Sequence, residues 1–197
     1  MPTLGISNSA HWFGIILTGE NMLEEDLVLT LNTPVLDRAE FYFIQNNQII
    51  RRSVVGDTIP LAELDYPYRI PVVPFHLNAQ EVETRIFMRA TSAVGVEIPL
   101  TLTTLGQFTA EQQSTMPFLG GLLSLFTLCF LFSGILYCFM RDTPFLAYTM
   151  FFGVAVIFFL TQTGLGRIWI WGENGEANSR ISMLSGCLLL ASFCLIG

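Results

Sequence analysis

The sequence predicts a mixed fold, with an N-terminal antiparallel β-sandwich followed by α-helical transmembrane segments. Three observations carry this prediction. Short aromatic and β-branched runs with turn signals between them fill residues 10–104, which is typical of an all-β domain. Long uncharged runs fill residues 117–197. Charge divides at the same place: residues 1–116 hold thirteen Asp or Glu and six Arg, so the whole net charge of −7 lies there.

Seven runs in the first part are candidate strands. Between the third and fourth, Asn46-Asn47 is typical of a hairpin turn. Ile86 and Met88 alternate with Arg85, Phe87 and Arg89, which indicates a strand with one buried and one solvated face. The prolines at 67, 71 and 74 point to an edge or bulged strand. The runs are HWFGIIL, EDLVLTL, AEFYFIQ, QIIRRSVV, RIPVVPFHL, ETRIFMRA and VEIPLTLTT.

The second part contains three candidate membrane helices, at about 117–140, 144–166 and 180–197. The first two are free of charge and exceed the roughly 18 residues that mark a transmembrane segment. The third stops with the chain, just short of a comfortable span. Core helices of a soluble protein are the alternative, but those are usually shorter and flanked by amphipathic partners. We therefore divide the chain into a sandwich over 1–108, a linker over 109–116 and a transmembrane region over 117–197.

The connection RDTP predicts a tight antiparallel hairpin between the first two helices. Pro144 would lie in the first turn of the second helix, and Asp142 or Thr143 would cap it. Arg141 and Asp142 would then lie in a turn at the membrane surface, where the chain reaches water. The alternative is that they contact a cytoplasmic output domain. Too few basic residues flank the helices to decide the orientation.

The connection RIWIWGENGEANS predicts a longer turn at the opposite membrane surface. Trp169 and Trp171 suit the headgroup level, and Asn174-Gly175 suits a turn. Asn178 or Ser179 would cap the third helix.

Sites for catalysis, metals or cofactors are not indicated. His11 and His76 lack metal-ligand spacing to a partner, and EEDL at 24–27 lacks the spaced oxygen ligands of a calcium loop. The four cysteines all lie in the apolar part. We expect them to behave as small apolar residues there and to form neither a disulfide framework nor a metal site. An acidic domain repels nucleic acid and anionic lipid headgroups, so we discount both as partners of residues 1–116.

Five motifs in order resemble the bacterial seven-transmembrane receptors with diverse intracellular signalling modules, the 7TMR-DISM family. LGISNSAHWFGIIL and LVLTLNTPVLDRAEFYFIQNNQ are similar to the opening strands of the family's second type of extracellular domain. GDTIPLAELDYPYRIPVVPFHL resembles its Gly-Asp-x-x-Pro stretch and Arg-x-Pro strand. MRDTPFLAYTMFF and TGLGRIWIWGENGEANSR resemble the links between its first three helices. The family's first helix often carries an asparagine near its middle, where this sequence has only Ser133.

The resemblance implies a jelly-roll-like periplasmic domain related to carbohydrate-binding modules, in a multi-pass protein of the bacterial inner membrane. A small saccharide or metabolite is then a candidate ligand, because aromatic faces stack on sugar rings and Arg groups bind hydroxyls. Tyr42, Tyr68, Arg69 and Arg89 are the candidate binding residues, although each also suits an ordinary sandwich position. The resemblance also implies that RDTP faces the cytoplasm.

We expect the chain to be an N-terminally truncated sensory fragment, without enzymatic activity of its own. The resemblance implies a cytoplasmic output domain, such as a histidine kinase or a diguanylate cyclase, in the full-length protein. A membrane-anchored structural or partner-binding subunit is the alternative, and an exposed apolar sheet face would favour it. A transporter or membrane enzyme ranks last, because the helices carry no charge at mid-membrane.

Overall fold

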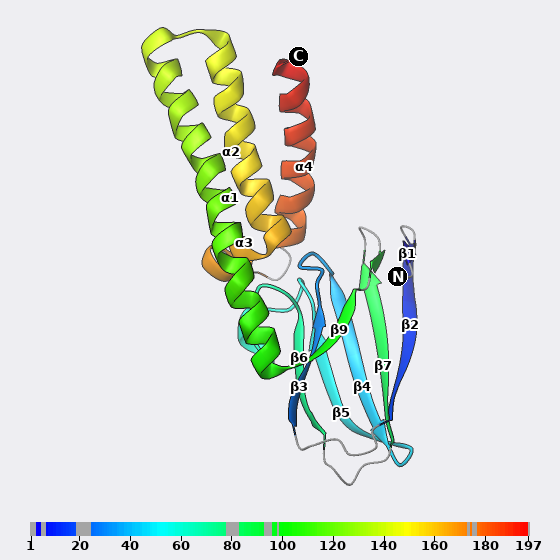
Figure 1. The fold of residues 1–197 in the computed structure, drawn as a ribbon. Helices are drawn as coiled ribbons and strands as arrows, with labels where there is room; N and C mark the ends of the chain where they lie inside the picture. The colour runs from blue at the N-terminus through cyan, green and yellow to red at the C-terminus, as the bar shows by residue number, and fades with distance from the viewer. Residues whose placement is uncertain are drawn as a thin grey trace.

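The structure is a computed structural model that describes residues 3–4, 7–18, 25–77, 83–92, 96–97, 99–172, 174 and 177–196. A β-sandwich forms the N-terminal part, and a group of long helices rises from one end of it (Figure 1). The predicted fold class, an antiparallel β-sandwich followed by apolar helices, is confirmed.

Two antiparallel sheets make up the sandwich. The first has the order β2-β7-β4-β5 and the second the order β6-β3-β9, while the short β1 pairs with β8. The strands are β1 (Thr3–Leu4), β2 (Ser7–Thr18), β3 (Glu25–Leu31), β4 (Arg38–Gln45), β5 (Gln48–Val55), β6 (Val72–Leu77), β7 (Glu83–Ser92), β8 (Val96–Glu97) and β9 (Leu100–Thr104).

Alternating side chains build the core between the two sheets. In β7, Ile86 and Met88 are fully buried, whereas Arg85 and Phe87 are exposed, as predicted from the sequence. Phe43 of β4 packs on Phe75 of β6 across the sandwich, with ring centroids 5.3 Å apart. Because successive side chains of a strand point to opposite faces, the same alternation fixes what the outer face displays.

The local turn and edge predictions also agree with the structure. Asn46 and Asn47 adopt positive φ values of 49° and 63°, which is the backbone that a two-residue hairpin between β4 and β5 requires. Pro74 lies in β6, an edge strand of the three-stranded sheet, where its missing N–H does not interrupt a ladder.

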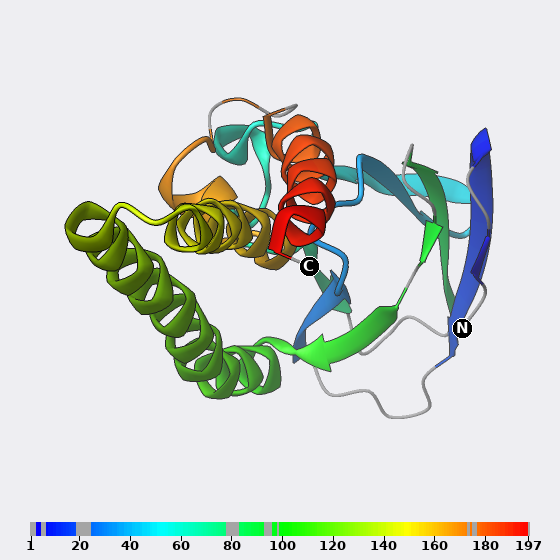
Figure 2. The ribbon, with the colours of Figure 1, turned by 90° about the horizontal axis from the view of Figure 1, so that it is seen from above.

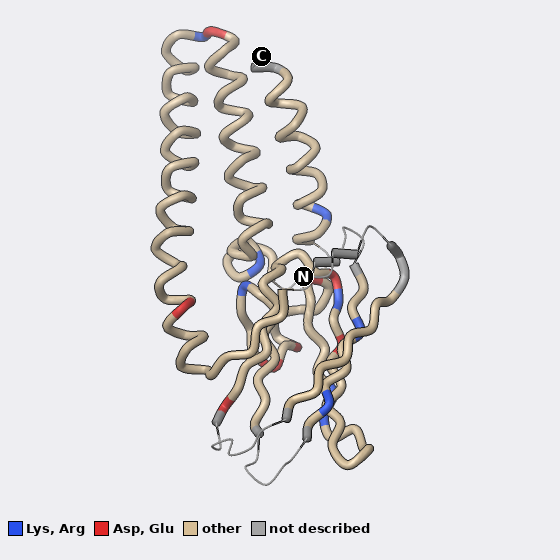
Figure 3. Tube along the Cα trace, turned by 45° about the vertical axis from the view of Figure 1, so that its right-hand side comes forward, with Lys and Arg blue, Asp and Glu red and all other residues tan. Residues whose placement is uncertain are grey.

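In the described part of the chain, four α-helices follow β9, and a 3₁₀ turn (Leu61–Glu63) lies between β5 and β6. They are α1 (Leu105–Met140), α2 (Thr143–Thr163), α3 (Leu165–Trp169) and α4 (Ala177–Ile196). Within the described residues, α1 and α2 are long and apolar enough to cross a membrane. Seen from above, the helices stand at one side of the sandwich (Figure 2), and they carry charge only near their ends (Figure 3).

The predicted linker 109–116 is not a separate segment, because it is helical and belongs to α1. This helix begins directly after β9, and the Thr104 hydroxyl accepts a hydrogen bond from the backbone N–H of Gln107 as its N-cap. Phe108 in the first turn is buried against Val28, Ile70 and Val72. The apolar contact of Phe108 with the sandwich explains why the helix starts twelve residues earlier than the uncharged run.

The predicted hairpin between the first two membrane helices is present. Arg141 ends α1 in the left-handed conformation, with φ of 58°, and Pro144 lies in the first turn of α2. Asp142 occupies the N-cap position of α2, but its side chain makes no capping hydrogen bond. Both Arg141 and Asp142 are exposed. The connection between α1 and α2 lies at the end of the helices away from the sandwich (Figure 1).

The second and third helices differ from their predicted bounds. α2 ends at Thr163, where Gly164 turns the chain with φ of 72°, and α3 follows at once. α4 begins at Ala177, so Asn178 and Ser179 lie inside its first turn and not at its N-cap. The predicted turn at Asn174-Gly175 lies partly outside the described residues.

Candidate functional site where the sandwich meets the helices

The loop that follows β5 joins the sandwich to the helices, and Gly56 sets its path. Gly56 has φ of 141°, and a Cβ there would lie 2.4 Å from the carbonyl oxygen of Asp37. Only glycine fits such a backbone and such an approach. The turn directs Asp57 and the carbonyl groups of the loop towards α3 and α4.

Arg167 of α3 is the cation that meets this loop. Its side chain is fully buried, with 2% of the residue exposed. The Nη2 group donates hydrogen bonds to the carbonyl oxygens of Gly56, at 2.9 Å, and of Ile59. Nε and Nη1 are buried and have no hydrogen-bond partner among the described residues. The two carbonyl groups therefore supply the hydrogen bonds that offset the burial of this guanidinium.

Asp57 and Asn178 form a second buried contact between the sandwich and the helices. Nδ2 of Asn178 donates to Oδ2 of Asp57 at 3.2 Å and to the carbonyl oxygen of Thr161 at 3.4 Å. Oδ1 of Asn178 accepts a hydrogen bond from the indole N–H of Trp171 at 3.1 Å. Asn178 thereby ties the sandwich, the end of α2 and the α3–α4 connection together. We call the contacts of Asp57, Arg167, Trp171 and Asn178 the junction network.

The environment of Asp57 disfavours its charge. Burial raises the pKa of Asp57 from 3.8 to about 6, against the opposing effects of the Asn178 hydrogen bond and the Arg167 charge, while the charge of Asp37 raises it further. Burial also lowers the pKa of Arg167, which the charge of Asp57 partly offsets. The protonation state of the junction therefore changes close to neutral pH.

A second interface joins Arg69 to the helices. Its Nη2 group donates to Oε1 of Gln112 in α1 at 2.7 Å, and its Nη1 group donates to the carbonyl oxygen of Thr163 at 3.4 Å. Gly164 lies against the Arg69 backbone so closely that a Cβ would be 2.1 Å from the Arg69 carbonyl oxygen. Arg69 thus contacts both membrane-type helices at their sandwich end.

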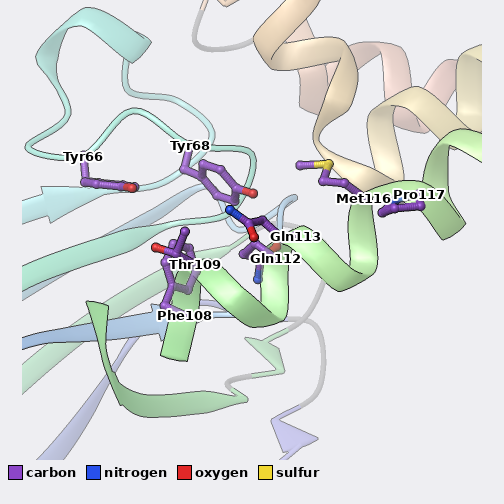
Figure 4. Close-up of a pocket in the computed structure, with 8 residues that line it drawn as sticks. All are labelled: Tyr66, Tyr68, Phe108, Thr109, Gln112, Gln113, Met116 and Pro117. Carbon is purple, nitrogen blue, oxygen red and sulfur yellow. The ribbon is translucent and has the colours of Figure 1, made fainter. Parts of the chain in front are cut away.

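A cleft of about 310 Å³ opens beside Arg69, between the 66–68 loop and the start of α1. Tyr68 packs edge-on against Phe108, with ring centroids 5.4 Å apart, and Tyr66 contacts both rings. Figure 4 shows the loop tyrosines and the α1 side chains on opposite sides of the cleft. Its lining consists of Tyr66, Tyr68, Phe108, Thr109, Gln112, Gln113, Met116 and Pro117.

Tyr42 and Arg89, the other predicted binding residues, lie elsewhere. They occupy the outer face of the four-stranded sheet, where both bind the carboxylate of Glu40. The Tyr42 hydroxyl donates to Oε2 at 2.6 Å, and Arg89 Nη1 lies 3.5 Å from Oε1. Arg52 and Arg38 each approach the same carboxylate at 3.0 Å. We call Arg38, Arg52 and Arg89 with Glu40 the arginine cluster.

The structure therefore separates the four predicted binding residues into two pairs. Tyr68 and Arg69 lie at the junction with α1, whereas Tyr42 and Arg89 lie on the outer sheet face. Residue-level reasoning did not single out Asp57, Arg167 or Asn178 as functional. Their signal was present in the family-like stretches, because GDTIP supplies Asp57, TGLGRIW supplies Arg167 and the Asn-Ser-Arg segment supplies Asn178.

His11 and His76 do not form a metal centre in the described part of the chain. Nδ1 of His76 lies 3.0 Å from Oδ1 of Asp26 on the surface. In the described residues, no group of three or more His, Cys, Asp or Glu side chains could hold a metal ion.

The fold and the junction define a class of protein: a β-sandwich domain fastened to the end of membrane-type helices. The family description 7TMR-DISM extracellular 2 matches residues 1–104, just over half of the chain, and the chain belongs to this receptor family. The sandwich is thus the extracellular sensory domain of a membrane receptor. No curated protein matches the sequence.

Proposed function

We propose that the sandwich binds a small extracellular ligand and that the junction network passes the resulting change to the membrane helices. The observation that carries this proposal is the buried contact of Asp57 and the Gly56 and Ile59 carbonyl groups with Asn178 and Arg167. These partners are separated by more than a hundred residues and belong to the two parts of the molecule. Because the contacts are buried and directional, a shift of the 56–71 loop changes what α3 and α4 contact.

The ligand is a small polar molecule, for which saccharides are the first class to examine. Two places support binding: the cleft beside Tyr68, and the outer sheet face that bears Tyr42 and Arg89. The cleft combines aromatic rings with the amide groups of Gln112 and Gln113 and lies directly on α1. Either place is linked to the helices, the cleft by contact and the outer face through the strands.

Hydrogen exchange of the full chain in lipid nanodiscs tests this function. We expect a binding saccharide, found by thermal shift in a panel of neutral and acidic sugars, to change the exchange of residues 56–71 and of residues 164–180 together. Exchange is an appropriate observable because local opening free energies differ between parts of a structure. A sugar that binds and leaves residues 164–180 unchanged would contradict coupling.

A matched pair of variants separates coupling from binding. Asn178→Ala removes a buried hydrogen bond of the junction network, whereas Ser182→Ala removes the hydroxyl that accepts from Gln162 on the exposed side of the same helix. We expect the first variant to bind the sugar and lose the exchange response at 164–180. The second variant should keep both properties.

We further propose that the helices cross the bacterial inner membrane as part of a multi-pass receptor whose output domain is cytoplasmic. The hairpin with Arg141 and Asp142 lies at the far end of the helices from the extracellular sandwich, which supports a cytoplasmic position for it. An Asp142→Cys variant in a chain with its four native cysteines replaced by serine tests this in cells. Labelling by a membrane-impermeant maleimide only after lysis is expected, and labelling of intact cells would refute the orientation.

A membrane-anchored partner-binding subunit is the second candidate function. The observation that favours it is the exposure of large apolar side chains on β2 and β5, among them Trp12, Ile16 and Ile49. They lie on the two outermost strands of the four-stranded sheet, where a partner protein could cover them. If no sugar or metabolite shifts the melting temperature of the folded chain, while Ile16→Ser and Ile49→Ser abolish a stoichiometric complex, this second function replaces the first.

A further inference from the structure

We propose that the outer face of the four-stranded sheet is a binding site for an acidic saccharide, one whose sugar rings carry carboxylates. This inference rests on the proposed sensory role of the sandwich and names its ligand class. The site combines the arginine cluster with an aromatic platform formed by Trp12, Tyr42 and Phe87.

The arginine cluster holds more positive charge than its own carboxylate can balance. Three guanidinium groups surround Glu40, so three positive charges and one negative charge leave two positive charges unbalanced. Glu40 itself is nearly buried beneath them, with 8% of its side chain exposed, whereas 54% of the Arg52 side chain and 36% of the Arg89 side chain remain exposed. The face therefore presents guanidinium groups to solvent on a domain that is otherwise acidic.

Glu40 also fixes where these guanidinium groups lie. Arg38 binds it through Nε, Arg52 through Nη2 and Arg89 through Nη1. Each guanidinium carries five N–H donors in a fixed plane, so these contacts use only part of each fork. Donors that are already positioned lose little conformational entropy when a ligand carboxylate binds, and Arg pairs with carboxylates in a bidentate manner.

Aromatic rings lie between these cations. Trp12 stacks on Tyr42 with ring centroids 5.9 Å apart and an interplanar angle of 27°. The guanidinium of Arg52 lies over the Tyr42 ring, 5.6 Å from its centroid. In the ladder, Trp12 is the partner of Arg89, while Gly14, Phe87, Tyr42 and Arg52 form one row across four strands.

Gly14 keeps this row open. It carries no side chain, and a Cβ there would lie 3.4 Å from Cε1 of Phe87, which shows that the Phe87 ring extends over the glycine. Trp12 is 59% exposed and Phe87 is 39% exposed, so flat apolar rings are accessible beside the guanidinium groups. Aromatic rings next to polar groups suit a ligand with an apolar ring face and a charged rim.

The chemistry of the face selects an acidic sugar over other anions. A peptide that binds by strand addition would pair along the edge of β2 or β5, whereas Glu40, Tyr42, Phe87 and Arg89 lie across the face on β4 and β7, which are paired on both sides. A chain of uronic acids matches this face, because its sugar rings can stack on the aromatic side chains while its carboxylates bind the guanidinium groups.

Isothermal titration of the full chain in nanodiscs with trigalacturonate tests the site, with maltotriose as the neutral trisaccharide. We expect trigalacturonate to bind, and to bind more weakly as salt is raised, because two or more charges are paired. Arg52→Gln and Arg89→Gln should each weaken binding about tenfold or more, the usual effect of one charge-assisted hydrogen bond. Trp12→Ala should weaken it as well, and Trp12→Phe less.

Arg51→Gln is the matched control, because Arg51 is the neighbour of Arg52 in the same strand. Arg51 is partly exposed, with 38% of its side chain accessible, but it pairs with Asp65 at 2.7 Å outside the arginine cluster. Removal of the same charge there should leave affinity nearly unchanged. Equal losses from Arg51→Gln and Arg52→Gln would reduce the effect to general charge and overturn the site.

Other outcomes also decide the proposal. Equal binding of maltotriose and trigalacturonate, or no binding of trigalacturonate to the folded chain, would overturn the acidic ligand class. If hexaglutamate bound as tightly as trigalacturonate, and Trp12→Ala did not weaken it, the face would bind polyanions in general and the saccharide class would be wrong. The proposed function fails separately: trigalacturonate that binds through Arg52 and leaves exchange at 164–180 unchanged supports this site and contradicts coupling. A sugar that changes the exchange at 164–180 and binds equally well to the Arg52→Gln variant supports coupling and contradicts this site.

Discussion

Two carboxylates of the sandwich, Asp57 at the junction and Glu40 on the outer sheet face, have pKa values that their surroundings shift in opposite directions. Asp57 is buried, and its burial raises its pKa to about 6. The hydrogen bond from the Tyr42 hydroxyl, followed by those from Arg52 and Arg38, lowers the pKa of Glu40 to about 2 although partial burial opposes this. The junction therefore holds a carboxyl group that is easily neutralised, whereas the outer face holds one that stays charged.

The arginines near these carboxylates differ in the same sense. Arg69 and Arg167 are buried. Both donate hydrogen bonds across the boundary between the sandwich and the helices, to backbone carbonyl groups and, in the case of Arg69, also to Gln112. Arg52 and Arg89 are partly exposed and surround one carboxylate. The difference indicates that the junction arginines hold the two parts of the molecule together, while the outer arginines are positioned to meet a ligand.

The largest effect is expected from loss of a junction arginine. Arg167→Ala removes the donor to the carbonyl groups of Gly56 and Ile59 and the positive charge that acts on Asp57. We expect a loss of about 2–4 kcal/mol in the free energy of unfolding, measured by thermal unfolding in nanodiscs. Arg141→Ala, at the exposed hairpin tip, is the control with little expected effect. Equal melting temperatures for the two variants would remove the distinction between buried and exposed arginines.

Next in size is the close approach of α2 to the sandwich. Gly164→Ala places a Cβ 2.1 Å from the Arg69 carbonyl oxygen at a φ of 72°, whereas a Cβ at Gly120 in α1 meets nothing within 4 Å. We expect Gly164→Ala to destabilise the chain by roughly 1–3 kcal/mol and Gly120→Ala to have a small effect of either sign. A stabilised Gly164→Ala chain would show that the helices do not press on the sandwich.

The two carboxylates also predict opposite pH responses. The folded-state pKa of Asp57 lies above its unfolded value of 3.8, so its contribution to stability grows as pH falls through about 6 towards 4. The folded-state pKa of Glu40 lies below its unfolded value of 4.5, so its contribution is complete above 4.5 and is lost as pH falls through about 2.

Hydrogen exchange of residues 56–60 between pH 7.5 and pH 5, corrected for intrinsic rates, measures the first response. We expect stronger protection at pH 5, and we expect Asp57→Asn to abolish the difference. Protection that weakens on acidification in the unaltered chain would show that Asp57 is stabilised as an anion.

The smallest effect is expected on the outer face. Arg52→Gln removes a solvent-accessible ion pair, and such pairs contribute little to the free energy of unfolding. We expect a melting temperature within about 2 °C of the unaltered chain, so that a loss of ligand binding in this variant reports recognition and not unfolding. A large drop in melting temperature would show that Arg52, like Arg167, is needed for the stability of the fold.

Much of the fold followed from the sequence because its signals are local. Alternation in TRIFMRA predicted which side of β7 is buried, and the Asn46-Asn47 pair predicted the hairpin. The start of α1 was missed because the charge-free run begins at Pro117, whereas the helix is nucleated earlier by the Thr104 cap and by Phe108 against the sandwich. Asn178 was predicted as a cap, since no local pattern shows that its partner is Asp57, 121 residues away.

The candidate sites show the same limit. Tyr42 and Arg89 proved to be neighbours on one carboxylate, but the sequence could not indicate that Glu40, Arg52 and Trp12 join them, because that follows from strand register. Tyr68 and Arg69 are adjacent in sequence and stay together at the junction. Whether any of the four binds a ligand stays a prediction.

A double-mutant cycle on Asp57 and Asn178 tests the central claim, that the sandwich is fastened to the helices through the junction network. Unfolding free energies in nanodiscs would be compared for Asp57→Ala, Asn178→Ala and the double variant. We predict an interaction energy of about 1–2 kcal/mol, as for neighbours that share a buried hydrogen bond. Additive effects, with an interaction energy near zero, would contradict the claim.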